Sequence, residues 1–229
     1  MTNRSDPAGK ARPGTILAIE SGSRGLSVAI MKDGAVVARE AVLTDHGQAT
    51  MLIPMIERVR AEAGLAYTDL SRIAVAAGPG SFTGLRVGLA AALGLSLAAE
   101  VPAIGISSFH GARVGLERSA DARLIVVLDS RREEPFVAEV GDGEQFLREP
   151  SVMTVAALDA FVKAAAPCIL CGDAPALDRY QSMEGIRVER RAADATGVAM
   201  LAADPERRYD LPPKPVYVRP PDVTMPKKP

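Results

Sequence analysis

The stretch AAGPGSFTGLRVGLAAALGLSLAA, residues 76–99, has three glycines in its first nine residues and then becomes apolar. Glycine-rich loops at helix starts often hold phosphates. This loop has the spacing G-x-G-x-x-x-G, one residue longer than the dinucleotide fingerprint, and no Walker-type Gly-Lys-Ser/Thr follows. The strand expected at 102–107 also ends without an acid for a ribose. We therefore interpret the loop as a structural turn that lets a helix approach a sheet closely. Its residues are Gly78, Pro79, Gly80, Ser81, Phe82, Thr83, Gly84 and Arg86.

The helix that follows is apolar nearly all round. Between Leu85 and Ala99 the only polar side chains are those of Arg86 and Ser96, whereas a surface helix normally carries a polar face. Gly84, Gly88 and Ala92 recur every four residues and form a small-residue ridge that permits close packing. Either the rest of the chain covers this helix, or the helix is a protein–protein interface. The sequence leaves both alternatives open.

The order of elements predicts an α/β fold with two lobes. Three strands joined by hairpin-type turns come first, with Asp33-Gly34 in one turn, and β-α-β units follow. The second half repeats this order, so each lobe is expected to be a mixed sheet flanked by helices, the actin-like and sugar-kinase-like (ASKHA) architecture. The first half has strands at 15–21, 25–31, 36–43, 72–77 and 102–107 and helices at 47–64 and 85–99. The second has strands at 123–130, 135–141, 144–149, 167–173 and 186–191 and helices at 154–166, 174–183 and 194–203.

We expect four segments along the chain. Residues 1–14 form a disordered arm, 15–107 an N-terminal lobe with the partner-binding helices, 108–205 a C-terminal lobe, and 206–229 a proline-rich tail. The tail is either flexible and solvated or an extended lid.

Composition excludes several classes of protein. The 229 residues are 48% hydrophobic and 24% charged with a net charge of −1, so no large electrostatic footprint on nucleic acid is expected. The first fourteen residues are not a secretory signal, and the apolar run near 87–99 falls short of the roughly 18–20 residues of a membrane helix. We predict a cytoplasmic protein without a membrane segment.

Two acid-containing loops stand where this architecture normally holds nucleotide phosphates. The first is IESGSRG, with Glu20 and Arg24; the second is LDSRREEPF, which begins with Leu128-Asp129, lacks glycine and carries four charged side chains directly after Ser130. Backbone amides can surround a phosphate only where side chains leave room, so the second loop is unsuited to phosphate.

Other candidate sites also favour structural roles. The chain has two histidines, His46 and His110, without metal-ligand spacing. Cys168 and Cys171, three apart in a strand, point to opposite faces and are expected to be buried thiols. Ser107 or Ser108 is expected to cap a helix rather than to act as a nucleophile. We therefore predict no catalytic, cofactor-binding or metal-binding residues.

The segment GPGSFTGLRVGLAAALGLSLAAEVPAIGISS, residues 78–108, resembles the TsaB (YeaZ) family. ILAIESGSRGLSVAI resembles the family's opening strand, although Glu20-Ser21-Gly22 stands where Asp-Thr-Ser is usual. VVLDSRREEPFVAEV and PVYVR are similar to two later segments, so the resemblance runs from about 15 to 219. Gln48 departs from the family, which often has a histidine there.

The resemblance implies a non-catalytic scaffold or activator subunit, not an enzyme on its own. Its complex would form threonylcarbamoyladenosine next to the anticodon of bacterial tRNAs reading ANN codons. The implied partners are a TsaD-like catalytic subunit and a TsaE-like ATPase, with ATP and metal held by these partners and tRNA bound through the complex. The alternative is an independent ATP-dependent transferase or kinase of the same architecture. A peptidase label, once attached to the wider family, has no supporting metal-ligand spacing.

In this family the first lobe's helices pair with those of TsaD, so helical spacing within 47–64 and 84–99 selects interface candidates. Self-pairing through the same helices and contact of the basic tail (Lys214, Arg219, Lys227, Lys228) with tRNA stay open. The interface candidates are Leu52, Met55, Leu85, Leu89, Ala92 and Leu93.

Overall fold

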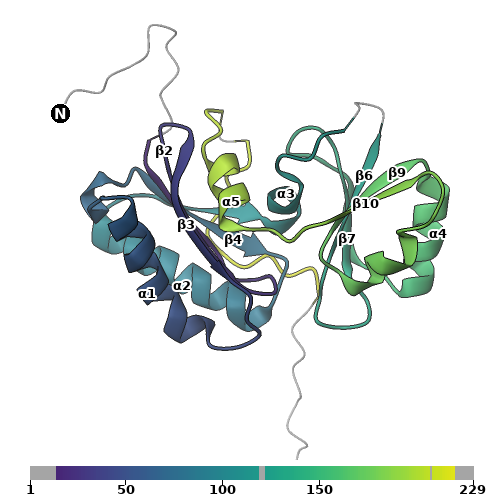
Figure 1. Ribbon diagram of the computed structural model, residues 1–229, viewed down its shortest axis with the longest axis horizontal. Coiled ribbons are helices and arrows are strands. Elements are labelled where there is room, and N and C mark those ends of the chain that lie inside the picture. The colour runs from purple at the N-terminus through teal and green to yellow at the C-terminus, as the bar shows by residue number, and fades with distance from the viewer. Residues whose placement is uncertain (1–13, 119–121, 207, 220–229) are drawn as a thin grey trace, which may run out of the picture.

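The computed structural model describes residues 14–118, 122–206 and 208–219, which form two lobes side by side (Figure 1). Each lobe contains one five-stranded mixed sheet with helices on its faces. The two-lobed α/β fold predicted from the sequence is therefore confirmed.

The N-terminal sheet has the strand order β3-β2-β1-β4-β5. Strands β1 to β3 pair antiparallel, whereas β4 and β5 continue the sheet in parallel from β1. Apolar side chains alternate along β1, so Leu17 and Ile19 face one core and Ile16 and Ala18 face another. The strands are β1 (Ile16–Glu20), β2 (Leu26–Lys32), β3 (Ala35–Val42), β4 (Arg72–Gly78) and β5 (Ala103–Ser107).

Helices cover both faces of this sheet. α1 (Gln48–Glu62) and α2 (Phe82–Ala99) pack on one face and α5 (Ala195–Ala202) on the other, while the 3₁₀ turn η1 (Tyr67–Asp69) precedes β4. The predicted C-terminal lobe, residues 108–205, includes the segment of α5, and the structure corrects this assignment. Val198 and its apolar neighbours on α5 pack against β1, β2 and β4, because no helix among the described residues of the first half of the chain covers that face of the sheet.

The C-terminal sheet has the order β10-β9-β6-β7-β8. α4 (Val155–Ala165) and the 3₁₀ helix η2 (Pro175–Tyr180) cover one face, and α3 (Ser108–Arg113) lies on the other, toward the first lobe (Figure 1). Cys168 and Cys171 are free, buried and on opposite faces of β9, as predicted. The strands are β6 (Arg123–Leu128), β7 (Phe136–Val140), β8 (Phe146–Val152), β9 (Cys168–Gly172) and β10 (Ile186–Arg190).

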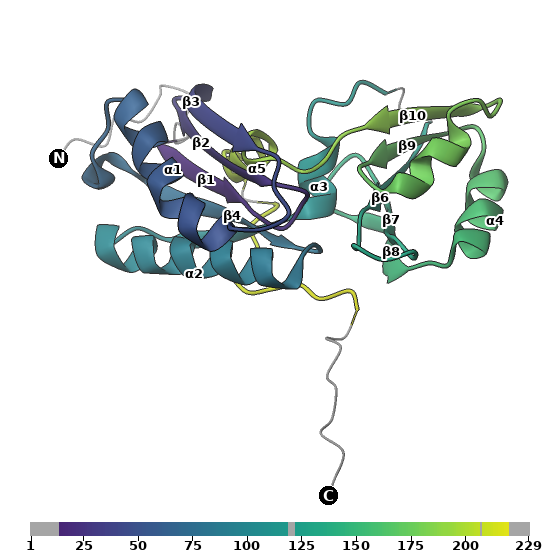
Figure 2. The same ribbon diagram turned by 60° about the horizontal axis from the view of Figure 1, so that its bottom comes forward.

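Part of the proline-rich tail is docked. The segment 211–219, here called the strap, runs along the first lobe below α2 (yellow in Figure 2). Leu211 and Gly105 exchange backbone hydrogen bonds of 2.8 and 2.9 Å, and the Val216 amide donates to Ala77 O at 2.8 Å. Of the two alternatives for the tail, this segment fits the extended one, because its backbone groups pair with β4 and β5 of the first sheet. Lys227, Lys228 and residues 1–13 of the arm lie outside the described residues.

Helix α2 is longer than the sequence suggested, since it starts at Phe82 and spans 18 residues. Among the described residues it is the one helix whose length and composition would allow it to cross a membrane. This is weak evidence, because the core helix of a soluble protein passes the same test. One side of α2, which includes Leu85, Leu89 and Ala92, packs into the core of the first lobe.

Candidate functional site at the lobe junction and along α2

The glycine loop fixes the start of α2 against the loop between β1 and β2. A Cβ atom at Gly80 would lie 2.5 Å from Gly22 O, and one at Gly84 only 2.0 Å from Ser21 O. The Ser81 amide donates to Gly22 O at 2.7 Å, and Ser21 Oγ donates to Gly84 O at 2.8 Å. The glycines therefore allow backbone to pack on backbone, where any larger residue would collide.

The first acidic loop is closed by its own carboxylate. Glu20 is buried, and its Oε1 accepts hydrogen bonds from the amides of Gly22 (2.7 Å) and Ser23 (2.9 Å), while Ser23 Oγ donates to Oε2 at 2.5 Å. Burial raises the pKa of Glu20 to about 7, although these hydrogen bonds oppose the shift. The amides that would have to face a phosphate are already occupied, and the occupying group carries negative charge when ionised.

The second acidic loop, between β6 and β7, is filled by charged side chains. The Asp129 carboxylate accepts from the Arg131 amide at 2.8 Å and lies 3.1 Å from Arg24 Nε of the other lobe. Arg131 has a φ of 61°, in the left-handed region, and its guanidinium reaches across to Asp45 (2.5 Å) and Ser23 O (3.0 Å). Side chains thus fill the space where a backbone cradle for phosphate would have to form.

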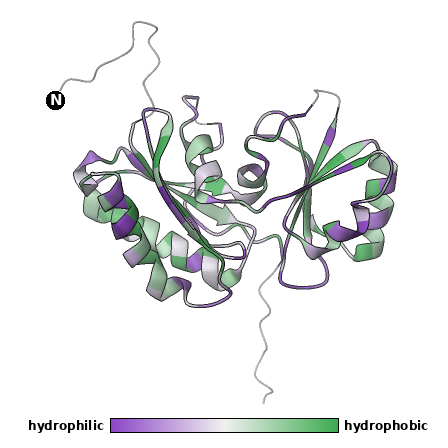
Figure 3. Ribbon diagram, in the orientation of Figure 1, coloured by the Kyte–Doolittle hydropathy of each residue, from purple (hydrophilic) through white to green (hydrophobic). Residues whose placement is uncertain are grey.

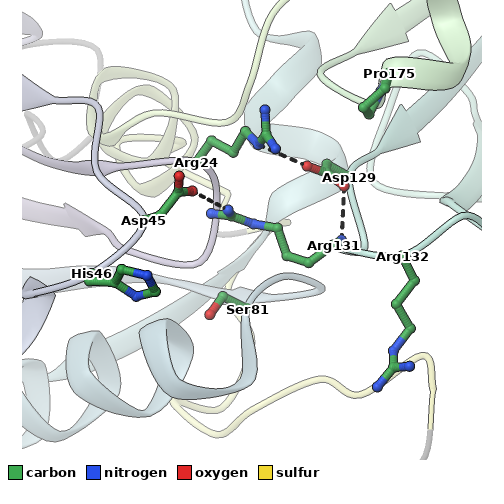
Figure 4. A pocket seen from close by; sticks show the side chains of 8 residues that line it. All are labelled: Arg24, Asp45, His46, Ser81, Asp129, Arg131, Arg132 and Pro175. Atoms are coloured by element: carbon green, nitrogen blue, oxygen red, sulfur yellow. Dashed lines mark hydrogen bonds and ion pairs between the residues drawn. The ribbon is translucent and has the colours of Figure 1, made fainter.

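An open pocket of about 580 Å³ lies between these loops. Figure 4 shows Arg24 directed toward Asp129 and Arg131 directed toward Asp45 across the pocket. Its lining therefore already contains charge pairs of the protein's own. The lining residues are Arg24, Asp45, His46, Ser81, Asp129, Arg131, Arg132 and Pro175.

The two histidines lie in different environments. His46 lines the pocket, whereas His110 is buried beside Phe146 and burial lowers its pKa to about 4, which keeps it neutral. Ser107 is the N-cap residue of α3, although its side chain makes no capping hydrogen bond, and the buried Ser108 Oγ has no hydrogen-bond partner. Within the described ranges, no three His, Cys, Asp or Glu side chains are arranged to hold a metal ion.

The structure separates the six interface candidates into two groups. Five are in the core of the first lobe and cannot contact a partner while the lobe is folded; Leu93 is 47% exposed. The prediction was wrong for these five because a helix that is apolar all round gives no periodic signal for its outer face. The five buried candidates are Leu52, Met55, Leu85, Leu89 and Ala92.

The outer face of α2 also carries Leu97, which is 82% exposed and which the sequence reasoning missed. Leu93 and Leu97 each follow a glycine of the small-residue ridge, Gly84 and Gly88, by nine residues, which is two and a half helical turns. They therefore lie opposite this ridge, and only the structure shows that the ridge is the packed side, since Cβ atoms at Gly84 and Gly88 would lie 2.0 and 2.3 Å from Ser21. Figure 3 shows that apolar residues extend along α2.

The start of α2 carries an aromatic contact from the strap. The Tyr217 ring stacks on Phe82 with 5.4 Å between centroids, and the Arg86 guanidinium lies 3.8 Å from the Phe82 centroid. Arg86 Nε also donates to Tyr217 Oη at 3.2 Å. Phe82 and Arg86 of the glycine loop therefore anchor the strap rather than a ligand.

Residues 40–198 match the family model described as TsaD, tRNA N6-adenosine threonylcarbamoyltransferase. The chain is 38% identical over 126 residues to the tRNA threonylcarbamoyladenosine biosynthesis protein TsaB of Escherichia coli, which is 54% of each chain. It is 31% identical over 130 residues to the protein of the same name from Haemophilus influenzae, 55% of this chain and 53% of that one. The chain thus spans about half the length of these curated relatives.

One solved structure matches nearly the whole fold. It is described as an uncharacterized protein with similarity to peptidase YEAZ from Pseudomonas aeruginosa. The TM-score is 0.71 at 22% identity, and the match covers 90% of this chain and all of that one. At this identity the likeness supports the two-lobed fold alone.

Proposed function

Because the chain belongs to the TsaD family, and within it to the TsaB (YeaZ) group, we propose that it is a non-catalytic scaffold and activator subunit in the synthesis of threonylcarbamoyladenosine in tRNA. The modified adenosine lies next to the anticodon of tRNAs that read ANN codons. In this proposal the chain pairs with a TsaD-like catalytic subunit in the cytoplasm, and a TsaE-like ATPase joins the pair. ATP and metal belong to those partners, and tRNA is bound by the complex.

The observation that carries the proposal is the apolar outer face of α2. Leu93 and Leu97 are exposed on a helix whose other side is fixed to the sheet, so the face is rigid as well as apolar. Burying a leucine side chain contributes about 1.5–3 kcal/mol, so two leucines against a partner helix provide a substantial part of a specific interaction. The helical face fits the helix pairing that the family resemblance implies.

The closed acidic loops support the non-catalytic part of the proposal. Glu20 occupies the amides of its own loop, and Arg24 and Arg131 are paired with Asp129 and Asp45. A phosphate would have to displace a buried carboxylate that is already hydrogen-bonded, and charged side chains fill the second loop. We therefore expect nucleotide affinity of the isolated chain to be weak.

The test of the interface is capture of the TsaD-like protein from the same organism by the tagged full chain. The double variant Leu93→Asp/Leu97→Asp places two carboxylates in the proposed contact, and we expect it to lose at least about 90% of the captured partner. Leu147→Asp is the matched control, since Leu147 is 65% exposed but lies on β8 of the other lobe. Undiminished capture by a folded double variant would refute the interface.

Depletion of the chain should lower threonylcarbamoyladenosine in bulk tRNA, measured by mass spectrometry, and an unchanged level would refute the pathway role.

The second candidate function is an independent ATP-dependent transferase or kinase. The observation in its favour is the pocket of about 580 Å³ between the lobes, with three arginines in its lining. Calorimetry of the isolated chain with Mg-ATP separates the two candidates. Micromolar binding would favour the transferase, and absence of binding at millimolar ATP would favour the scaffold. Sedimentation of the chain alone, with and without Leu93→Asp/Leu97→Asp, reports self-pairing through the same face.

A further inference from the structure

The two lobes meet through a close helix crossing on one side of their junction. α3 of the second lobe crosses α5, which packs on the first sheet (Figures 1 and 2). A Cβ atom at Gly197 on α5 would lie 2.6 Å from Gly111 O on α3. The two short helices therefore approach each other backbone to backbone at this point, and α3 also contacts β4 and β5 of the first sheet. We take the crossing as the pivot of rotation between the lobes.

A second connection joins the lobes through residues 129–134, here called the junction loop. Asp129 lies 3.1 Å from Arg24 Nε, and Arg131 donates to Asp45 at 2.5 Å (Figure 4). Two ion pairs of opposite polarity therefore span the pocket, since the first lobe supplies the arginine of one pair and the carboxylate of the other. A third ion pair is made by the strap, whose Arg219 donates to Glu134 at 2.8 Å. The strap itself is held on the first lobe by its backbone pairing with Ala77 and Gly105.

The three ion pairs across this connection alternate in polarity. From the junction loop, Asp129 pairs with Arg24, Arg131 with Asp45 and Glu134 with Arg219. The loop also carries Arg132 and Glu133 between Arg131 and Glu134. A displacement that aligned Arg131 with Arg24 or Asp129 with Asp45 would bring like charges together. The pattern therefore favours one relative position of the lobes and opposes its neighbours.

The junction loop is also braced internally. Asp129 Oδ1 accepts from the Arg131 amide at 2.8 Å, and Ser130 Oγ donates to Glu134 O at 2.6 Å. The Asp129 amide donates to Asp173 Oδ1 at 2.9 Å, which ties the loop to the end of β9. These bonds fix the loop backbone that carries the three paired side chains, Asp129, Arg131 and Glu134, which lowers the entropy lost when the pairs form.

We propose that the junction loop and the strap form an ionic lock that holds the two lobes closed around the pivot between α3 and α5. The lock stands where proteins of this architecture would hold phosphate, and it fixes the lobe orientation without a ligand. Most of its side chains are partly exposed, with Arg24 at 58% and Asp45 at 64%, whereas the Asp129 side chain is buried with 5% exposed. Exposed ion pairs are individually weak and are screened by salt, so the lock is reversible and its strength depends on ionic strength.

Single-molecule fluorescence transfer between the lobes tests the lock in the full chain. Dyes are attached to Glu62→Cys on α1 and Gln181→Cys beyond η2, both exposed, while the buried native thiols stay unlabelled. We expect one narrow transfer peak at low salt. Arg131→Asp should raise the population of a second, more open state about tenfold by opposing Asp45, and Asp45→Arg added to it should restore the single peak. One molar NaCl should broaden the unmodified protein's peak, because the screening length falls to about 3 Å.

Arg58→Ala is the matched control, because it removes an exposed Arg–Glu pair, Arg58 with Glu40, that lies within the first lobe. This variant should leave the transfer peak unchanged. The lock is refuted if Arg131→Asp, with a native circular dichroism spectrum, keeps the unmodified protein's peak at both salt concentrations. Failure of Asp45→Arg to restore the peak in the folded double variant would also contradict it. If Arg131→Asp does not fold, the salt titration of the unmodified protein decides alone: a peak unchanged at one molar NaCl overturns the lock.

Discussion

Replacing Gly84 by alanine tests whether the glycine loop exists for packing. The added Cβ atom would lie 2.0 Å from Ser21 O, whereas ordinary van der Waals contact begins at 3.4 Å. The start of α2 and the loop after β1 must therefore separate by about 1.4 Å, the difference of these two distances. Neither partner is a flexible side chain, so the backbone itself has to move.

The magnitude follows from three contributions. Overpacking of a tight contact costs about 1–3 kcal/mol, and loss of the hydrogen bond from Ser21 Oγ to Gly84 O, 2.8 Å long, costs about 1 kcal/mol. The helix gains about 1 kcal/mol when alanine replaces glycine. We therefore expect Gly84→Ala to lower the free energy of unfolding by about 1–3 kcal/mol.

Gly94 offers the same substitution in the same helix without the collision. A Cβ atom at Gly94 would meet no heavy atom within 4 Å, and the position is exposed. Gly94→Ala should therefore raise the free energy of unfolding by about 0.5–1 kcal/mol through helix propensity alone. Because the two variants are expected to change the free energy of unfolding in opposite directions, a general effect of alanine in α2 cannot explain both results.

Urea unfolding followed by circular dichroism measures both variants through the shift in midpoint at unchanged slope. The reasoning is refuted if Gly84→Ala unfolds at the same urea concentration as Gly94→Ala, or above the unmodified protein. In that case the glycines would not be needed for packing, and a role for the loop in binding would have to be considered again.

Three further predictions concern buried groups. Burial raises the pKa of Glu20 from 4.5 to about 7; the folded state therefore keeps a proton that the unfolded state loses, and stability falls as pH rises through this window. Glu20→Gln keeps the acceptor and should remove about 1–3 kcal/mol of that fall in urea unfolding at several pH values, whereas an unchanged profile would contradict the burial argument. Leu89→Ala should cost about 2–5 kcal/mol and Leu97→Ala less than about 0.5; equal costs would mean that α2 is oriented differently. Burial raises the pKa of Cys168, and it raises the pKa of Cys171 to about 12. Neither thiol should therefore react with a thiol reagent before denaturation, and rapid labelling would contradict their burial.

Hairpin turns and periodicity located most elements because these signals depend on residues close together in the chain. Asp33 has a φ of 51° and Gly34 has a φ of 85°, as a tight hairpin requires. This connection could therefore be predicted from these two adjacent residues alone. The glycine loop was likewise interpretable, because no nucleotide motif fits its spacing. The buried, opposed positions of Cys168 and Cys171 followed from strand alternation alone.

The sequence by itself thus determined the two mixed sheets, the order of their strands along the chain and the glycine-rich start of α2. Only the tertiary structure decided that α5 returns to the first sheet, that the strap crosses to Glu134 and that Leu97 rather than Leu89 faces outward. These features depend on contacts between residues far apart in the chain, and an all-apolar helix has no local pattern that selects its outer face. The amides of the first acidic loop show the same limit: their occupation by Glu20 depends on burial, which composition and spacing do not reveal.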